Sequence, residues 1–330
     1  MKNSRRDVAK FFGDDSADYL RHQYTHGADS FMAQRRERAA GLIRTCLVPF
    51  PGDSFRFLDA GCGPGILLEV LGRYPVRYVG IDISQQMLAL ARRQDAHCVA
   101  GFRCELLQAD VEQLPFPAGC FDAAASLGVI EYLNDDAGLL SELSRVTVPN
   151  GFVLLAVTNR FAYNLMLEKV LLALRRSRFA ARLLSGLKSG LGRGEFKQRP
   201  FTIRRHSPRQ FLRQLEERDL QPLAWQYWGF NFLPHPLHLL CGRRLNRLAN
   251  RLYDTVTWRP LRALGEGFIV LCQNQAAVSH PGLDRSVTGL AADRPGPGLA
   301  DGDRALRAAH ELSVALTAAD RKTTSTPARA

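Results

Sequence analysis

The chain has 330 residues, of which 46% are hydrophobic, and its formal net charge is +12. That length and apolar content allow one large globular domain or two smaller ones, and no apolar run approaches the ~18 residues of a membrane-spanning helix. The first ten residues are basic, but they lead into Phe11-Phe12-Gly13-Asp14-Asp15 and not into the apolar core of a signal peptide. We therefore expect a protein that is neither exported nor transmembrane.

The seven cysteines are odd in number, form no Cys-x-x-Cys pair and mostly lie inside apolar runs. This usage is typical of reduced thiols in a cytosolic protein. The sequence therefore predicts a cytoplasmic location and no metal site.

Between residues 55 and 160, short apolar segments alternate with helical ones. Candidate strands lie at 56–60, 77–82, 103–108, 121–127 and 151–158, and helices are predicted at 64–73, 84–93 and 136–146. Such alternation is typical of a parallel, doubly wound α/β sheet with helices on both faces. Two more strands are predicted at 222–228 and 267–273. A helix precedes the first of these, with Ser207 as its cap and Pro208 at its first position.

A glycine-rich turn follows the first strand and reads Leu58-Asp-Ala-Gly-Cys-Gly-Pro-Gly65. Its alternating glycines let the backbone turn tightly and approach a ligand where side chains would collide. Asp82 ends the second strand, and a carboxylate at that place can accept hydrogen bonds from a ribose diol. A dinucleotide fingerprint would need a glycine at position 66, which is isoleucine. The turn therefore indicates an adenosine-containing cofactor other than NAD.

The Asp59-x-Gly61-x-Gly63-x-Gly65 pattern resembles motif I of class I S-adenosylmethionine (SAM) methyltransferases. Three further segments match that family in order: Gln108-Ala-Asp-Val111 before Leu114-Pro-Phe-Pro117, Phe121-Asp122, and Val148-Pro-Asn-Gly151. The resemblance covers residues 55–160. It implies a seven-stranded Rossmann-like sheet whose last strand lies antiparallel between strands five and six.

The same resemblance implies that SAM is the cofactor. Asp59 would orient the glycine loop and the methionine amino group, Asp82 would hold the ribose, and Asp110 would accept a hydrogen bond from the adenine amine. The full set of residues that the resemblance assigns to the cofactor is Asp59, Gly61, Gly63, Gly65, Asp82, Ile83, Asp110, Val111 and Leu127.

Residues 1–54 look like the helical cap that precedes motif I in this family. Within it, Phe31 to Leu47 is expected to be helical, and we interpret its Arg35-Arg36-Glu37-Arg38 run as a face in water. Alternatively, Tyr24 or His26 contacts the cofactor or the acceptor.

A general base is less clearly indicated. Many relatives place Glu-His or His-His after the fourth strand, where this chain has Glu131-Tyr132. Glu131 and His206 are our catalytic candidates, with His235 and His238 as further histidines in or beside the insertions. A solvated carboxylate at a helix start is the alternative for Glu131, and transfer without a dedicated base also stays open.

The positive charge is concentrated in one part of the chain. Residues 1–159 hold 16 Lys and Arg against 19 Asp and Glu, residues 160–263 hold 21 against 6, and residues 264–330 hold 7 against 7. The basic part contains two insertions, 160–206 and 229–266, which we expect to leave the ligand-binding edge of the sheet and converge over the substrate mouth.

Both insertions interleave arginine with leucine, for example Arg243, Arg244, Arg247 and Arg251 beside Leu245, Leu248 and Leu252. Such helices suit an anionic membrane surface, with Trp225, Trp228, Phe230 and Phe232 nearby. A soluble lid with its arginines in water is the equal alternative. Nucleic acid is not predicted, because the recognisable RNA-binding modules are absent from the sequence.

The predicted domains are therefore a helical cap (1–54), a SAM methyltransferase domain with two basic insertions (55–275) and a mostly disordered tail (276–330). Thr158-Asn159-Arg160 and Ser207-Pro-Arg-Gln-Phe-Leu212 also resemble quinone-biosynthesis O-methyltransferases. The predicted function is O-methylation of a small apolar or lipid-linked acceptor, in the cytoplasm and on the inner surface of the membrane. N- or C-methylation of a polar metabolite and a non-catalytic SAM-binding scaffold are the alternatives.

Overall fold

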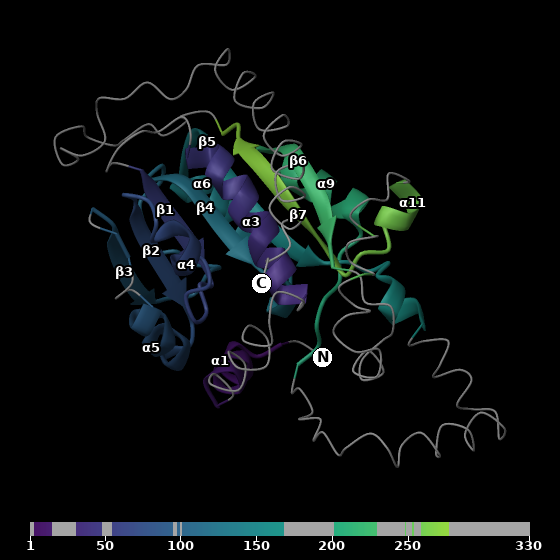
Figure 1. The fold of residues 1–330 in the computed structure, drawn as a ribbon, viewed down its shortest axis with the longest axis horizontal. Coiled ribbons are helices and arrows are strands. Elements are labelled where there is room, and N and C mark those ends of the chain that lie inside the picture. Colours follow the sequence, from purple (N-terminus) through teal and green to yellow (C-terminus); the bar gives the residue numbers. More distant parts are fainter. Residues whose placement is uncertain are drawn as a thin grey trace, which may run out of the picture.

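The computed structural model describes residues 3–14, 31–47, 55–94, 98–99, 101–167, 201–229, 248, 253 and 259–276. These residues form a seven-stranded sheet with the spatial order β3-β2-β1-β4-β5-β7-β6 (Figure 1). The strands are β1 (Arg56–Ala60), β2 (Arg77–Asp82), β3 (Arg103–Gln108), β4 (Phe121–Leu127), β5 (Thr147–Thr158), β6 (Leu220–Trp228) and β7 (Gly267–Asn274).

The first five strands run parallel, and β7 runs antiparallel to both β5 and β6. This arrangement confirms the predicted Rossmann-like sheet and the predicted place of the last strand. Because the carboxyl ends of parallel strands meet at one edge, the residues after β1, β2 and β4 come together there.

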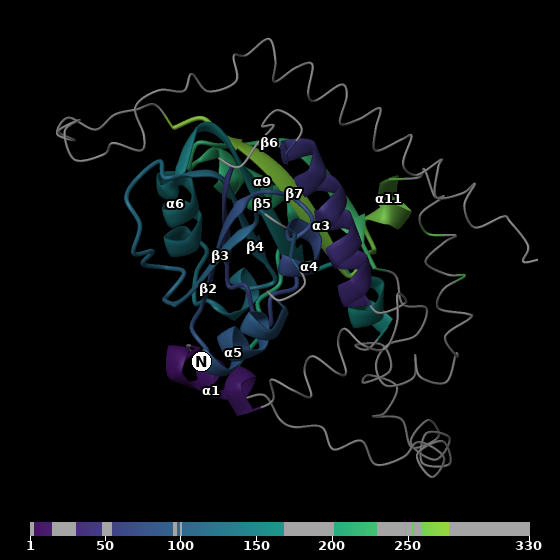
Figure 2. The ribbon, with the colours of Figure 1, turned by 60° about the vertical axis from the view of Figure 1, so that its left-hand side comes forward.

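Helices cover both faces of the sheet, as the doubly wound pattern predicts. One face packs on α3 (Phe31–Leu47), α4 (Leu68–Leu71) and α5 (Gln85–Gln94), and the other packs on α6 (Ala137–Val146) and α9 (Pro208–Glu216). Neighbouring strand residues alternate between these cores: Phe57 belongs to the first and Leu58 to the second. Figure 2 separates α6 from α3, with the sheet between them.

Three local predictions differ from the structure. The helix predicted at 64–73 is confined to α4, and residues 63–67 form turns instead. β5 begins at Thr147, before the predicted start at 151; within this added part Asn150 adopts a left-handed φ of 61°, and the register with β4 shifts between Phe121 and Ala123. Ser207 precedes α9 as predicted, and Pro208 is at its start, but the Ser207 side chain makes no capping hydrogen bond.

The N-terminal segment lies at the carboxyl edge of the sheet. Its helix α1 (Arg5–Asp14) sits beside α5 in both ribbon views (Figures 1 and 2). The expected helix from Phe31 to Leu47 is present as α3. Tyr24 and His26 lie outside the described residues.

The described ends of the two insertions are joined to each other. Asn159, at the start of the first insertion, donates from Nδ2 to the carbonyls of Ala263 and Gly265, both at 2.8 Å, at the end of the second. The backbone N–H of Asn159 donates to the Glu266 carbonyl at 2.9 Å. The bases of the insertions therefore converge at one edge. Apart from Leu248 and Tyr253, the rest of both lies outside the described residues, and so do Arg243, Arg244, Arg247, Arg251, His235, His238, Phe230, Phe232 and the tail from 277.

No helix among the described residues is long and apolar enough to cross a membrane.

Replacing Asn159 with alanine tests this junction. The side chain is 0% exposed, so its loss leaves the buried carbonyl of Gly265 and the partly buried carbonyl of Ala263 without this donor. We expect the free energy of unfolding in urea to fall by about 3 kcal/mol. Asn164→Ala is the matched control, because that amide is only partly buried, donates once, to Glu266, and accepts once, from the neighbouring Leu165 N–H. Equal losses in the two variants would contradict the role given to Asn159.

Candidate functional site

A cavity opens at the carboxyl ends of β1, β2 and β4, between these strands and the N-terminal helices α1 and α3. It encloses about 1140 Å³ of space not occupied by atoms, part of it open to solvent. Its walls come from six parts of the chain: the start of the protein, α3, the turn after β1, the turn after β2 with the start of α5, the segment after β3 and the segment after β4.

The turn after β1 is held open by its hydrogen bonds to β2. The backbone N–H groups of Gly61 and Cys62 both donate to the Ile81 carbonyl at 2.8 Å. Gly61 has a φ of 80°, and a Cβ there would overlap the Val129 side chain. A Cβ on Gly63 would meet nothing within 4 Å, although its φ of 54° also disfavours other residues. At Gly61 and Gly63, no side chain therefore separates the backbone from the cavity.

Asp82 links this turn to the end of β2. Its Oδ2 accepts a hydrogen bond from the Gly63 N–H at 2.9 Å, and its Oδ1 accepts one from the Ser84 N–H at 2.8 Å. Burial raises the pKa of Asp82, and these backbone hydrogen bonds oppose that shift. Each carboxylate oxygen has a further lone pair, so Asp82 can still accept hydrogen bonds from a ligand in the cavity.

Asp59, at the end of β1, is 2% exposed and lines the cavity. Burial raises its pKa to about 7, against the hydrogen bond from Tyr78; the charge of Asp82 raises it further and that of Arg35 lowers it. The Tyr78 hydroxyl donates to Asp59 Oδ2 at 2.7 Å. A ligand cation near Asp59 would favour its ionised form.

Arg35 corrects our interpretation of the Arg35–Arg38 run as a face in water. It is 6% exposed, lines the cavity and lies with its guanidinium carbon 5.8 Å from the centre of the Trp228 ring. A Cβ on Gly128 would overlap the guanidinium, so this glycine makes room for it. The signal was present in the sequence, because Arg35, Ala39 and Ile43 recur at helical spacing on one buried stripe.

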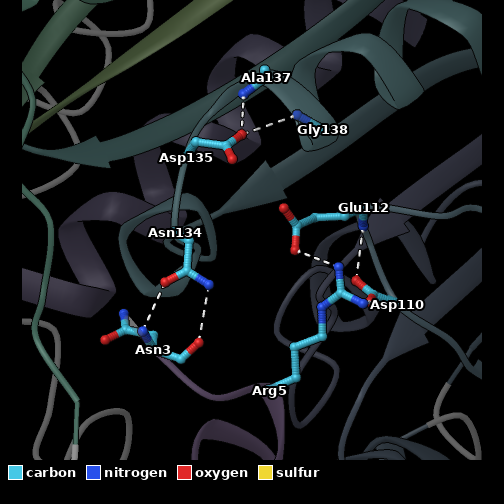
Figure 3. Close-up of polar contacts among 8 residues, drawn as sticks. All are labelled: Asn3, Arg5, Asp110, Glu112, Asn134, Asp135, Ala137 and Gly138. Atoms are coloured by element: carbon cyan, nitrogen blue, oxygen red, sulfur yellow. Dashed lines mark hydrogen bonds and ion pairs between the residues drawn. The ribbon is translucent and has the colours of Figure 1, made fainter. Parts of the chain in front are cut away.

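The far end of the cavity is closed by the N-terminal segment. Arg5 of α1 pairs with Asp110 at 2.7 Å and with Glu112 at 3.0 Å, and Asp110 Oδ1 also accepts a hydrogen bond from the Glu112 N–H at 2.9 Å (Figure 3). Asp110 is therefore held in a fixed orientation on the cavity wall. Arg5 was not among the predicted site residues.

Asn3 fastens this segment to two distant parts of the chain. Its Nδ2 donates to the carbonyls of Tyr132 at 2.8 Å and Thr202 at 2.9 Å, and its Oδ1 accepts from the Thr202 N–H at 3.0 Å. Its backbone exchanges two hydrogen bonds with the Asn134 side chain (Figure 3). The N-terminus, the segment after β4 and the end of the first insertion therefore meet at Asn3.

Aromatic rings pack beside that junction. Phe12 lies 5.0 Å from Tyr132, and Phe201 lies 5.5 Å from Tyr132 and 5.1 Å from Phe11, as ring-centre distances. Phe12 and Tyr132 also line the cavity. These contacts give the cavity an apolar wall on the side of the N-terminal helix.

The structure brings most of the predicted cofactor residues together. Those that line the cavity are Asp59, Gly61, Gly63, Asp82, Ile83, Asp110, Val111 and Leu127. Gly65 does not line it; its φ is 82°, and a Cβ there would press on Leu68 and Ala91, so its role is close packing of the turn on α4 and α5.

The two catalytic candidates do not line the cavity. Glu131, in the short helix η2 (Ile130–Tyr132), is 7% exposed and accepts a hydrogen bond from the Thr158 hydroxyl. The alternative of a solvated carboxylate is therefore wrong, since Glu131 is buried against the end of β5. A catalytic role for it stays a prediction.

His206 is also buried, at 6% exposure, and its Nε2 lies 3.0 Å from Asp136 Oδ1. Arg204 donates to the same oxygen at 2.6 Å. Burial acts to raise the pKa of Asp136, but the contacts with His206 and Arg204 outweigh it and lower the pKa. This cluster ties the end of the first insertion to the start of α6, and a catalytic role for His206 likewise stays a prediction.

Comparison with known proteins agrees with this geometry. Residues 58–155 match the family model described as a methyltransferase domain. The ubiquinone biosynthesis O-methyltransferase of Methylocella silvestris is 33% identical over 129 residues, which cover 39% of this chain and 50% of that protein. The mitochondrial ubiquinone biosynthesis O-methyltransferase of Arabidopsis thaliana is 34% identical over 110 residues, covering 33% of this chain and 34% of that protein. The chain thus spans half or less of these relatives' length.

Among solved structures, the magnesium protoporphyrin IX methyltransferase of Synechocystis PCC 6803, with bound S-adenosylhomocysteine (SAH), is similar with a TM-score of 0.54. The two sequences are 15% identical, and the match covers 82% of this chain and 99% of that one. This likeness concerns the fold.

Proposed function

We propose that this protein is a class I SAM-dependent methyltransferase that transfers the methyl group of SAM to an oxygen of a small apolar or lipid-linked acceptor. The domain assignment rests on the matched region and on the fold. The acceptor and the methylated atom are our proposal.

One observation carries the cofactor assignment: the bare turn after β1 and the carboxylates of Asp59 and Asp82 lie on the same cavity. Asp82 would hold the ribose hydroxyls, Asp59 the amino group of the methionine part, and Asp110 the adenine amine. The buried guanidinium of Arg35 suits the carboxylate of the methionine part. SAM supplies a methyl group on positively charged sulfur and leaves as SAH once the acceptor takes that methyl.

The chain's own task is then to orient two ligands and to exclude water. Asn3 and Arg5 close the cavity from the N-terminal side. Phe12, Tyr132 and Leu133 give it an apolar wall, which supports an apolar acceptor. The names of the ubiquinone-biosynthesis relatives support the same class of acceptor.

Replacing Asp82 with alanine tests the cofactor site. Because the variant lacks the carboxylate, a charged hydrogen-bond acceptor, SAM binding measured by calorimetry should weaken by about 1.5–3 kcal/mol. Asp122→Ala is the matched control: Asp122 also accepts a backbone hydrogen bond, from Arg56 at 2.8 Å, but it lies at the amino end of β4. Undiminished SAM binding by the Asp82 variant would reject the site.

Turnover tests the proposed reaction. The protein is incubated with SAM and either a lipid extract or a polar metabolite extract, and SAH release is measured. We expect SAH with the lipid extract, and less of it from the Asp82→Ala variant at low SAM concentration. Release with the polar extract alone would contradict the acceptor class. Tight SAM binding without release from either extract would favour the scaffold alternative.

We further propose that the protein acts in the cytoplasm, on the inner surface of the membrane. Support comes from the 21 basic and 6 acidic residues of 160–263. In the described start of the first insertion, Phe161 is 46% and Met166 51% exposed, beside Arg160. Apolar side chains next to positive charge suit an anionic lipid surface.

Vesicle co-sedimentation tests this location. Wild type should bind anionic vesicles at low salt, and changing Arg243, Arg244, Arg247 and Arg251 to Gln should reduce binding, since each arginine contributes roughly 1 kcal/mol at such a surface. High salt should weaken binding, because the Debye length is ~8 Å at physiological ionic strength. The control changes Arg73, Arg77, Arg92 and Arg93, all exposed and outside the basic segment. If the wild-type protein does not bind anionic vesicles at low salt, the membrane location is wrong and the basic segment is a soluble lid.

A further inference from the structure

Tyr78 is a buried polar residue to which the function proposed above gives no role. It lies near the start of β2 and is 1% exposed. Its ring stacks on Phe57 of β1, with ring centres 6.3 Å apart and ring planes at 9°. A phenylalanine would fill the same space without a hydroxyl to satisfy, so the hydroxyl needs an explanation of its own.

That hydroxyl reaches a residue of the cofactor cavity. It donates to Asp59 Oδ2 at 2.7 Å, and no hydrogen bond to Asp59 Oδ1 is found among the described residues. Gly80 makes this reach possible, because a Cβ there would lie 2.9 Å from the Tyr78 ring and 3.1 Å from Cys62 Sγ. The ring therefore runs along β2 over Gly80 towards the cavity edge.

We propose that Tyr78 is a positioning residue for the amino group of the cofactor: its hydroxyl holds one oxygen of Asp59 and leaves the other oxygen for the ligand ammonium. This inference rests on the proposed SAM site. It assigns to β2 a second contribution to the site, in addition to Asp82 at the end of the strand.

The charges around Asp59 show why such a donor is needed. Burial and the nearby Asp82 favour the protonated form of Asp59, whereas the Tyr78 hydrogen bond and Arg35 favour the ionised form, and the pKa lies at about 7. Burial, with Asp59 and Cys62, also raises the pKa of Tyr78 well above its usual value, so the hydroxyl keeps its proton and remains a donor. The pKa of the Cys62 thiol is likewise raised by burial, which leaves that side chain neutral.

The affinity of the site for an ammonium ligand should depend on pH. An ammonium ligand binds the ionised form of Asp59, so affinity should rise as pH increases through about 7 and then level off. Removing the tyrosine hydroxyl removes a hydrogen bond to the ionised form. The pKa of Asp59 then rises, and the increase in affinity moves to higher pH.

The experiment compares two ligands by calorimetry between pH 6.0 and 7.5. SAH carries the amino group, and 5′-methylthioadenosine shares the adenosine part but lacks the amino-acid part. The affinity ratio of SAH to methylthioadenosine therefore isolates Asp59 from Asp82, which would face the ribose of both ligands. The variants are Tyr78→Phe, Asp59→Asn and, as a matched control, Tyr227→Phe, a half-buried tyrosine of β6 outside the cavity.

For wild type and the Tyr227 variant, we expect the ratio to increase about fivefold from pH 6 to 7, as an Asp59 pKa of about 7 requires. For Tyr78→Phe, the ratio at pH 7 should be about tenfold lower than for wild type, and it should increase about threefold from pH 7.0 to 7.5, against about 1.5-fold for wild type. Asp59→Asn should show a low ratio without pH dependence, and it tests the Asp59 contact even if the Tyr78 variant fails to fold.

Three results would overturn the inference. The first is a Tyr78→Phe ratio that follows wild type at every pH. The second is equal weakening of both ligands by Tyr78→Phe, which would mean a purely structural role. The third is an Asp59→Asn ratio equal to wild type. Wild-type protein that binds neither ligand would overturn the cofactor site itself, so the two failures are distinguishable.

Discussion

The turn after β1 depends on β2, and the rest of the site depends on that turn. Two adjacent backbone N–H groups share the Ile81 carbonyl, and a third, from Gly63, is taken by the Asp82 carboxylate. These bonds leave the backbone of Gly63 bare towards the cavity and fix Asp82 beside it. Since the parallel register sets Asp59 opposite Gly80, the same pairing brings both acidic residues to one edge. A ligand with a diol and an ammonium group fits this edge.

The cavity is completed by residues far away in the chain. Asn3 joins the N-terminus to Thr202, and Asn159 joins the start of the first insertion to the end of the second. The side chains of Asn3 and Asn159 are almost fully buried, and each makes several hydrogen bonds. The N-terminal wall of the cofactor cavity is thereby fastened to the end of the first insertion, whose base is tied to the second.

The parts that were predictable from sequence are those with local signals. Strand periodicity placed all seven strands, and the spacing of Asp59, the glycines and Asp82 located the cavity. Arg35 was missed because its charge was given more weight than its place on the buried stripe with Ala39 and Ile43. Contacts such as Asn3 to Thr202 join residues 199 positions apart and leave no local pattern. The solvated alternative for Glu131 was wrong because its partner, Thr158, lies at the end of β5, 27 positions further along the chain.

A crystal structure of the protein with SAH tests the central claim most directly, namely that the edge of β1 and β2 is the cofactor site. The account predicts the ribose hydroxyls within hydrogen-bond distance of Asp82, the amino group beside the Asp59 oxygen not held by Tyr78, and the adenine between Asp110 and Val111. SAH bound away from the turn that follows β1, or with its amino group remote from Asp59, would contradict it.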